Sequence, residues 1–459
     1  MMKYIGNIIK KTILVTLIVF GIQAYGSDYY PEVGECVAKS SWFKQPVLPP
    51  AEGVESPFAF VDGEDKSTNC NFHQWSWNKF LYLMQTDSKT DDLVMFGPNF
   101  YQVDNKMMPY FEPWNDMLNP TGTKLLKLMV LDDITQADGT VLSTKQDLGP
   151  VRYSIHVNDT FYQSAIDALN NGVNIGDKFE VGSVEIKAAW VDMAQLELLY
   201  PDTDIQQRFY VREALVEDDS VFKERANFAL LGIHVVGIVE NHPEFIWATF
   251  EHSMLSPDYF EGPADNSKYY DSSKAVSAVK DYALYKVGSK GSDVTLVGGS
   301  DKVINNTFRM FQYGVPTGLP YLGTDVSLSA SSEQREQDKD TFSNITQLND
   351  SVDKNLAEND SIWGNYFYSG SIWLSVQGYN FADGISGNIV GSKANPHLRG
   401  SLGLANITME TTFQAEPNPN TMPDKMVANN CFTCHGIGKD KSTMFTSHIF
   451  KNLVNSMQQ

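Results

Sequence analysis

Two cysteines and a histidine stand close together near the C-terminus, in the segment Cys431-Phe-Thr-Cys434-His435. Two thiols separated by two residues can bond to both vinyl groups of one haem from a single turn of chain. The histidine that follows then lies beneath the ring, where an imidazole nitrogen can bind the iron. The segment therefore predicts one covalent haem c, attached through Cys431 and Cys434, with His435 as the proximal iron ligand.

Three other uses of these residues compete with haem attachment. A redox-active dithiol is typical of a thioredoxin-like βαβ unit, and the sequence around residue 431 has no such pattern. A zinc site needs a second pair of ligands, for which the sequence offers His448 and more distant histidines. A disulfide between Cys431 and Cys434 would be strained. The motif favours haem over all three, because an export signal accompanies it.

The export signal lies at the N-terminus. Lysines at positions 3, 10 and 11 precede an apolar run over 13–22, and the small residues Ala24 and Gly26 follow it. This is the layout of a secretory signal peptide, and the apolar run is too short to span a bilayer. We expect a signal peptide over 1–26, an exported protein in the periplasm or outside the cell, and no stable membrane span after cleavage. An uncleaved N-terminal anchor is the alternative.

The chain is strongly acidic, with a formal net charge of −21. Removal of residues 1–26, which carry three lysines and no acidic residue, makes the charge −24. Such a chain repels phosphate backbones and anionic lipids, so we expect no nucleic-acid partner. The acidity either keeps an exported protein soluble or attracts a redox partner protein with a basic docking face. The oligomeric state stays open.

The motif comes late in the chain, since only 24 residues follow His435. At about 1.5 Å per residue, even a fully helical tail of this length makes one short helix and a turn. It cannot bury a porphyrin, and an exposed ring would forfeit several kcal/mol at about 25 cal/mol per Å² of apolar surface. We therefore expect residues upstream of the motif to form much of the haem pocket.

The sixth iron ligand is open at this stage. Haem iron commonly takes a methionine or histidine there. Met409 lies shortly before the motif in an apolar-flanked stretch, joined to it by a polar loop, and Met444 and His448 lie in the tail. Met422 and Met426 lie in or beside the loop. We name Met409, Met444 and His448 as candidate distal ligands. The alternatives are that the methionines only fill the core and that the sixth position is open.

The placement of the motif resembles that of exported bacterial monohaem cytochrome c-domain proteins, a large and poorly characterised family with a C-terminal CxxCH. Weaker similarities to that family lie in 70–83 (CNFHQWSWNKFLYL), 242–252 (HPEFIWATFEH) and 400–414 (GSLGLANITMETTFQ). The resemblance implies one c-type haem and assigns no activity. Small cytochromes c differ in that their haem motif comes first.

The remaining chain is long enough for one large domain or two ordinary ones. It is rich in aromatic residues, with 26 Phe, 21 Tyr and 8 Trp. We expect a large α+β or mainly β domain over 27–415, followed by a short helical haem-attachment segment over 416–459 that packs against it.

Hydrophobic periodicity predicts the main elements of this domain. Strands are expected at 183–193, 228–240 and 244–255, the last two joined through Asn241-His242-Pro243, and at 124–134 paired with 139–143. Helices are expected at 72–84, at 159–172 with a stop at Asn-Asn-Gly, and at 343–360 with Ser343 as N-cap. The polar stretches 256–274 and 323–341 are expected to be surface loops.

Cys36 and Cys70 are the other two cysteines. In an oxidising compartment they favour a disulfide, which would stabilise the fold by about 3–4 kcal/mol. Two separate buried thiols are the alternative.

Several histidines have competing interpretations. His73, with Trp75 and Trp77, either lines a pocket or belongs to a core-facing aromatic helix, and the core is favoured. His234 is expected to be a core histidine with its hydrogen bonds satisfied.

A second group, His242, Glu244, Glu251 and His252, lies along one expected strand. Ten residues of strand span about 33 Å, so these side chains cannot converge on one metal ion. We assign no metal site to them.

Together these features predict an exported c-type cytochrome that transfers single electrons. One alternative is a haem-dependent oxidoreductase, peroxidase-like or oxidase-like, with an open sixth site. Another is a ligand-binding module with a haem relay. No catalytic residue is assigned, since the sequence lacks a nucleophile elbow, a phosphate loop and a dinucleotide fingerprint.

Overall fold

The computed structural model describes residues 35–110, 128–135, 141–144, 149–218, 221–256, 280–285, 287–288, 303–304, 313, 332–389, 394–410 and 430–458. The expected signal peptide lies outside these ranges. So do the loop that holds Met422 and Met426, nearly all of 256–274, and residues 323–331 of the second polar stretch.

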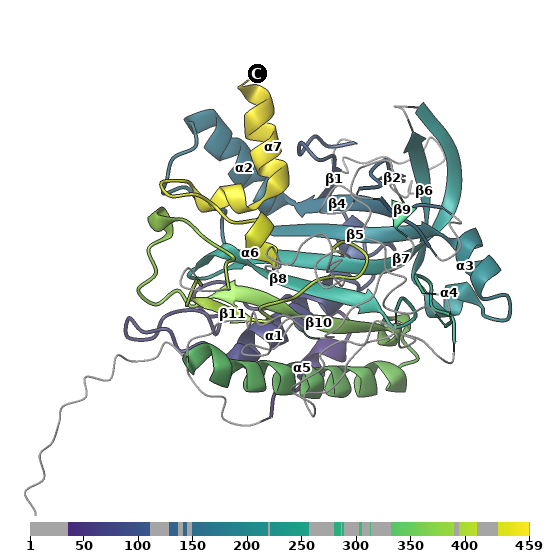
Figure 1. The fold of residues 1–459 in the computed structure, drawn as a ribbon, viewed down its shortest axis with the longest axis horizontal. Coiled ribbons are helices and arrows are strands. Elements are labelled where there is room, and N and C mark those ends of the chain that lie inside the picture. The colour runs from purple at the N-terminus through teal and green to yellow at the C-terminus, as the bar shows by residue number, and fades with distance from the viewer. Residues whose placement is uncertain are drawn as a thin grey trace, which may run out of the picture.

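The structure combines helices with one large sheet, which confirms the α+β class (Figure 1). The helices are α1 (Asn69–Leu83), α2 (Asp159–Asn171), α3 (Met193–Leu199), α4 (Ile205–Arg208), α5 (Ser332–Glu358), α6 (Cys431–Cys434) and α7 (His448–Met457). Short 3₁₀ helices are η1 (Ser40–Phe43), η2 (Val94–Phe96), η5 (Ile362–Asn365), η6 (Phe381–Asp383) and η8 (Thr443–Thr446). The strands are β1 (Phe100–Val103), β2 (Met129–Leu131), β3 (Val141–Leu142), β4 (Arg152–Asn158), β5 (Val184–Asp192), β6 (Val211–Asp218), β7 (Val221–Val239), β8 (His242–His252), β9 (Val303–Ile304), β10 (Tyr366–Leu374) and β11 (Leu398–Gly400).

In the described ranges, nine strands form the large sheet, in the order β1-β4-β5-β7-β8-β10-β11, with β6 paired to β7 and β2 paired to β6. All pairs in it are antiparallel except β2–β6. The expected strands at 183–193, 228–240 and 244–255 are confirmed as β5, β7 and β8. Asn241 turns the chain between β7 and β8 with φ of 64°, a left-handed conformation that asparagine adopts more readily than most residues.

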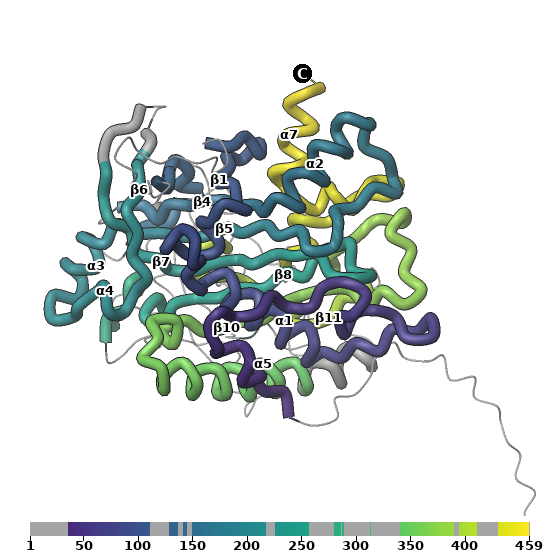
Figure 2. Tube along the Cα trace, turned by 180° about the vertical axis from the view of Figure 1, so that it is seen from behind, coloured from purple at the N-terminus to yellow at the C-terminus, as the bar shows by residue number. Residues whose placement is uncertain are grey.

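One face of the sheet packs on helices α1 and α5, and the opposite face packs on the C-terminal segment (Figures 1 and 2). Along β5, Val184, Ile186 and Ala188 point into the α1–α5 side because side chains alternate on a strand. Glu185 and Lys187 consequently point toward the C-terminal segment. This alternation decides which side chains form the site described below.

Helix α1 is buried on nearly all sides. Its first turn has a capping box, in which Thr68 and Asn71 each accept from the other's backbone N–H. Cys70 in the same turn forms a disulfide with Cys36, as expected. His73, Trp75 and Trp77 are all buried, which confirms the core interpretation of this aromatic helix.

Helix α2 begins after the Asn158 cap and ends at Gly172, whose φ of 76° is the left-handed conformation that favours glycine. The expected stop is therefore confirmed.

Helix α5 begins at Ser332 rather than at Ser343. The expected apolar stripe is confirmed, since Ile345, Leu348, Val352 and Leu356 are buried. The prediction of a loop over 323–341 is wrong from residue 332 onward. The added turns (SEQREQDKDT) are rich in Glu, Gln, Arg and Lys, which have good helix propensity without supplying an apolar stripe.

The expected pairing of 124–134 with 139–143 is also wrong. β2 pairs in parallel with β6, and β3 pairs with β9, while Thr135 and Val141 form only an isolated bridge. The two segments are close in sequence, which favoured a hairpin, but each pairs instead with a strand that is distant in the chain. In the described part of the chain, no helix has both the length and the apolar character needed to cross a membrane.

Candidate functional site

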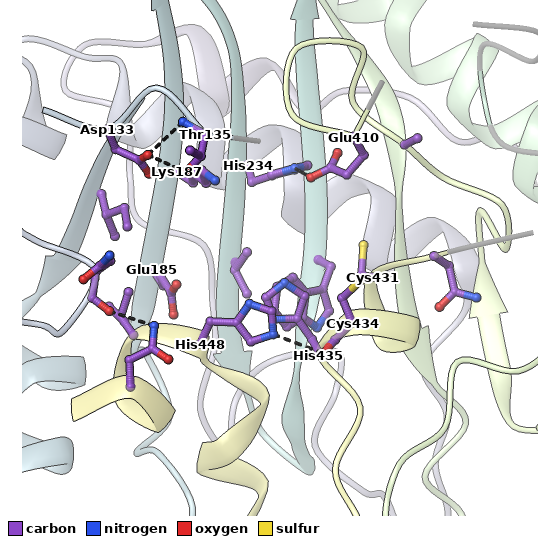
Figure 3. Close-up of a pocket in the computed structure, with 18 of the residues that line it drawn as sticks. Asp133, Thr135, Glu185, Lys187, His234, Glu410, Cys431, Cys434, His435 and His448 are labelled. Atoms are coloured by element: carbon purple, nitrogen blue, oxygen red, sulfur yellow. Dashed lines mark hydrogen bonds and ion pairs between the residues drawn. The ribbon is translucent and has the colours of Figure 1, made fainter. Parts of the chain in front are cut away.

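A cavity of about 310 Å³ lies between the sheet and the C-terminal segment (Figure 3). This size falls at the lower end of the range of small-molecule pockets. Among the described residues, thirteen of the nineteen that line it precede the CxxCH motif in the chain, so upstream residues form much of this cavity. The lining residues are Asn105, Asp133, Thr135, Ile155, Glu185, Lys187, His234, Val236, Trp247, Leu404, Ala405, Glu410, Asn430, Cys431, Cys434, His435, His448, Ile449 and Asn452.

The sheet contributes two neighbouring cross-strand rows to this cavity. One row runs through Glu185, Val236 and Trp247, and the other through Ile155, Lys187 and His234. Each row combines residues from three strands because antiparallel partners point to the same face. Residues that are far apart in sequence therefore meet over one patch of the sheet.

The one-turn helix α6 holds the motif against this patch. At its start the Thr433 hydroxyl accepts from the backbone N–H of Asn430, and the Asn430 amide donates to the carbonyl of Gly387. Ile385 and Ile437 exchange two backbone hydrogen bonds just beyond the motif. Gly387 lies so close to α6 that a Cβ there would overlap the backbone of Phe432 and Thr433. The upstream chain thus fixes the position of α6.

Cys431 and Cys434 keep their thiols, while the other two cysteines form the disulfide. Both thiol residues line the cavity, as Figure 3 shows. Burial raises the pKa of Cys431 well above its ordinary value, and the nearby charge of Glu410 raises it further. The thiol form is therefore the stable one in this pocket.

His435 is oriented by the backbone of η8. Its Nδ1–H donates to the carbonyl of Thr446 at 2.7 Å, and because a carbonyl can only accept, the proton must lie on Nδ1. This leaves Nε2 with a lone pair for a metal ion. Burial lowers the pKa of His435 well below its ordinary value, the nearby ionisable side chain of His448 lowers it further, and the hydrogen bond to Thr446 raises it partly. The neutral imidazole is the form that ligates metals.

His448 lies beside His435 rather than opposite it. The two rings are stacked, with centroids 3.9 Å apart and an interplanar angle of 18°, and His448 Nε2–H donates to the carbonyl of Cys434 at 3.0 Å. Two axial ligands of one haem meet the iron end-on from opposite faces. Rings stacked flat against each other do not have this arrangement.

Met409 and Met444 do not line the cavity. Met409 is fully buried in an apolar cluster with Tyr153 and Leu231, and Met444 is fully buried in another with Phe432 and Phe450. Of the three candidate distal ligands, the structure thus brings only His448 to the cavity.

The pair formed by His234 and Glu410 was not predicted from the sequence. His234 Nε2 lies 2.9 Å from Glu410 Oε1, and both residues line the cavity (Figure 3). His234 has its expected hydrogen-bond partner but lies at the pocket rather than in the apolar core. The alternation of buried Ile233 and Val235 around it could have placed His234 on the opposite face of β7, but no local signal links it to Glu410.

Glu185 and Lys187 were also missed as pocket residues. Burial raises the pKa of Glu185 to about 7, while the Ser447 hydroxyl and Lys187 lower it partly. Its Oε2 is buried with no hydrogen-bond partner in the described part of the chain. The ammonium of Lys187 lies over the ring of Tyr153, 4.7 Å from its centroid. The cavity floor therefore carries groups of both charge signs.

The four polar residues along β8 do not come together. His242 and Glu244 form a buried pair at 2.9 Å at one end of the strand. At the other end, Glu251 accepts from the backbone N–H of Ile407, and His252 stacks on Phe209. In the ranges that the structure describes, no three His, Cys, Asp or Glu side chains form a group able to hold a metal ion.

The residues at the motif fit a c-type haem. Two thiols and a neutral imidazole with an available Nε2 face one cavity, and the imidazole is held by a carbonyl, the usual outer partner of a metal-ligating histidine. Comparison of the chain with protein-family models, with curated proteins and with solved structures found no match.

Proposed function

We propose that this protein is an exported c-type cytochrome that transfers single electrons. It would carry one haem c on Cys431 and Cys434, with His435 as the proximal iron ligand. The observation that carries the proposal is the anchoring of His435, whose Nδ1–H donates to Thr446 and leaves Nε2 available beside two thiols. When bound, the haem supplies a one-electron couple between ferric and ferrous iron.

The chain's own residues then have distinct tasks. The Thr446 carbonyl orients the imidazole and raises its basicity as a ligand. The indole of Trp247 packs against the same ring, with centroids 4.1 Å apart, and so limits its rotation. The sheet covers the site from one side and excludes water, which helps to set the reduction potential.

The N-terminal signal pattern supports a periplasmic or extracellular location. The net charge of −21 supports a redox partner with a basic docking face. Salt screens the attraction between an acidic protein and a basic partner, so electron transfer to such a partner should slow as the ionic strength rises.

Haem attachment is tested by expressing the full chain with c-type maturation machinery and denaturing the product. We expect haem to stay with the polypeptide in wild type and in the control Thr433→Ser, which keeps the motif spacing. It should be lost when Cys431 and Cys434 are both changed to Ala. Wild-type protein without covalent haem would refute the proposal. A reversible one-electron titration of the holoprotein would then support electron transfer.

A second candidate function is a haem-dependent oxidoreductase that binds a small ligand at an open sixth position. The His234–Glu410 pair favours it, since an imidazole beside a carboxylate can move protons to or from a bound ligand. Carbon monoxide distinguishes the two functions. A ferrous spectrum that it leaves unchanged supports the electron carrier, and rapid binding supports the oxidoreductase.

A further inference from the structure

The cavity contains a third histidine besides His435 and His448, and its hydrogen bonding resembles that of His435. His234 Nε2 lies 2.9 Å from Glu410 Oε1. Glu410 therefore engages the Nε2 side of the ring, and Nδ1 is the ring nitrogen that it does not contact. Metal-ligating histidines almost always donate their second ring N–H to a carboxylate or a carbonyl. His234 has the carboxylate version of this anchor, and His435 has the carbonyl version.

His234 and His435 reach the cavity from two different parts of the fold. His234 belongs to the sheet and His435 to the C-terminal segment, and both line the same cavity. On β7 and β8, His234 pairs with Thr249, so Trp247 is its diagonal neighbour. Diagonal neighbours on an antiparallel sheet lie about 7–8 Å apart, and the His435 ring lies on Trp247.

Glu410 is itself held firmly. Its second oxygen, Oε2, accepts from the backbone N–H of Asn406 at 2.8 Å. The Asn406 amide donates to Thr249, the cross-strand partner of His234, at 2.7 Å. The segment around Asn406 and Thr408 lies so close to β7 that a Cβ on Gly232 would crowd both side chains. A polar network that is anchored on two strands therefore fixes the imidazole of His234 through Glu410.

Resting on the proposed function, we propose that His234, held by Glu410, is the distal axial ligand of the haem. The ring nitrogen that Glu410 leaves available would bind the iron. Met409 and Met444 lie in apolar clusters and do not line the cavity, and His448 stacks beside His435. Coordination by two imidazoles gives a six-coordinate iron that rearranges little between its two oxidation states, which suits electron transfer.

The test uses the full-length holoprotein and optical spectra of its ferric and ferrous forms. We expect wild type to be low-spin, with the near-infrared magnetic circular dichroism typical of two imidazole ligands. His234→Ala should be high-spin, should bind carbon monoxide when reduced, and should return to low-spin when imidazole is added. His397→Ala removes a half-buried histidine that does not line this cavity, and it should keep the wild-type spectrum.

If His234→Ala folds poorly, a second variant at the same position still tests the assignment. His234→Met keeps a ligand of similar size and should give the near-infrared band of histidine–methionine ligation. A low-spin, CO-insensitive His234→Ala protein would overturn the assignment, as would a high-spin wild type. In both cases covalent haem would still be present, so the proposed haem attachment would survive. Absence of covalent haem from wild type would overturn both.

Discussion

The imidazole of His435 lies against the indole of Trp247, with ring centroids 4.1 Å apart. Trp247 comes from the middle of β8, and its indole N–H donates to the carbonyl of Glu244 at 3.2 Å. The CxxCH motif is thus in direct contact with the sheet, and the sheet can fix the orientation of its histidine.

Trp247→Ala should destabilise the protein and loosen His435. Truncation of a buried tryptophan costs about 3–5 kcal/mol. We expect urea unfolding to show a loss of this size, together with a broader distribution of iron spin states in the ferric spectrum. Trp247→Phe keeps an aromatic ring in the place of the indole and should lose less than half as much. Equal losses in both variants would show that the ring contact has no role.

Gly387→Ala should push α6 away from its seat. A Cβ at residue 387 would overlap the backbone of Phe432 and Thr433, and such overpacking typically costs about 1–3 kcal/mol. We expect a lower unfolding free energy and a smaller yield of covalent haem. Gly176→Ala is the matched control, because nothing lies within 4 Å of a Cβ there, and it should stay within about 0.5 kcal/mol of wild type. Full haem yield in Gly387→Ala would contradict this prediction.

The protein should lose stability in mild acid because of two buried histidines. Burial lowers the pKa of His73 to about 3 and that of His252 to about 3, against an ordinary value of 6.5. Both stay neutral in the folded protein while they take up protons in the unfolded chain. The stability is thus full above pH 6.5 and falls as the pH drops toward 3. Each histidine should contribute a loss of about 2 kcal/mol between pH 7 and pH 5.

Urea unfolding at both pH values checks this prediction, with His252→Gln as the informative variant. The variant should be less stable at pH 7, since it loses the stack on Phe209, but its stability should fall about 2 kcal/mol less on acidification. An unchanged pH dependence would argue against a neutral His252.

Removal of the disulfide should lower stability without removing the haem. Cys36 and Cys70 enclose a loop with a sequence separation of 34, for which the chain-entropy model gives about 3–4 kcal/mol. We expect the double Ala variant to unfold at lower urea and to keep its covalent haem, because the motif uses the other two cysteines. Loss of haem in a folded double variant would refute this separation of roles.

Much of the fold was predictable from local pattern. The period-two alternation of 183–193 and the apolar residues around Asn241 gave β5, β7 and β8, and the stop at Gly172 gave the end of α2. The start of α5 and the partners of β2 and β3 were not predictable in this way. A helix of charged residues has no apolar stripe to mark it, and strand pairing is decided by contacts between residues far apart in the chain.

The sequence by itself determined the spacing of Cys431, Cys434 and His435, on which the proposed haem attachment depends, because these residues lie close together along the chain. Only the tertiary structure decided which upstream residues share the cavity with the motif. His234 and Glu410 are separated by 176 positions, and the strand register together with the docking of the chain at 406–410 brings them together. Such long-range geometry leaves no trace in local residue spacing.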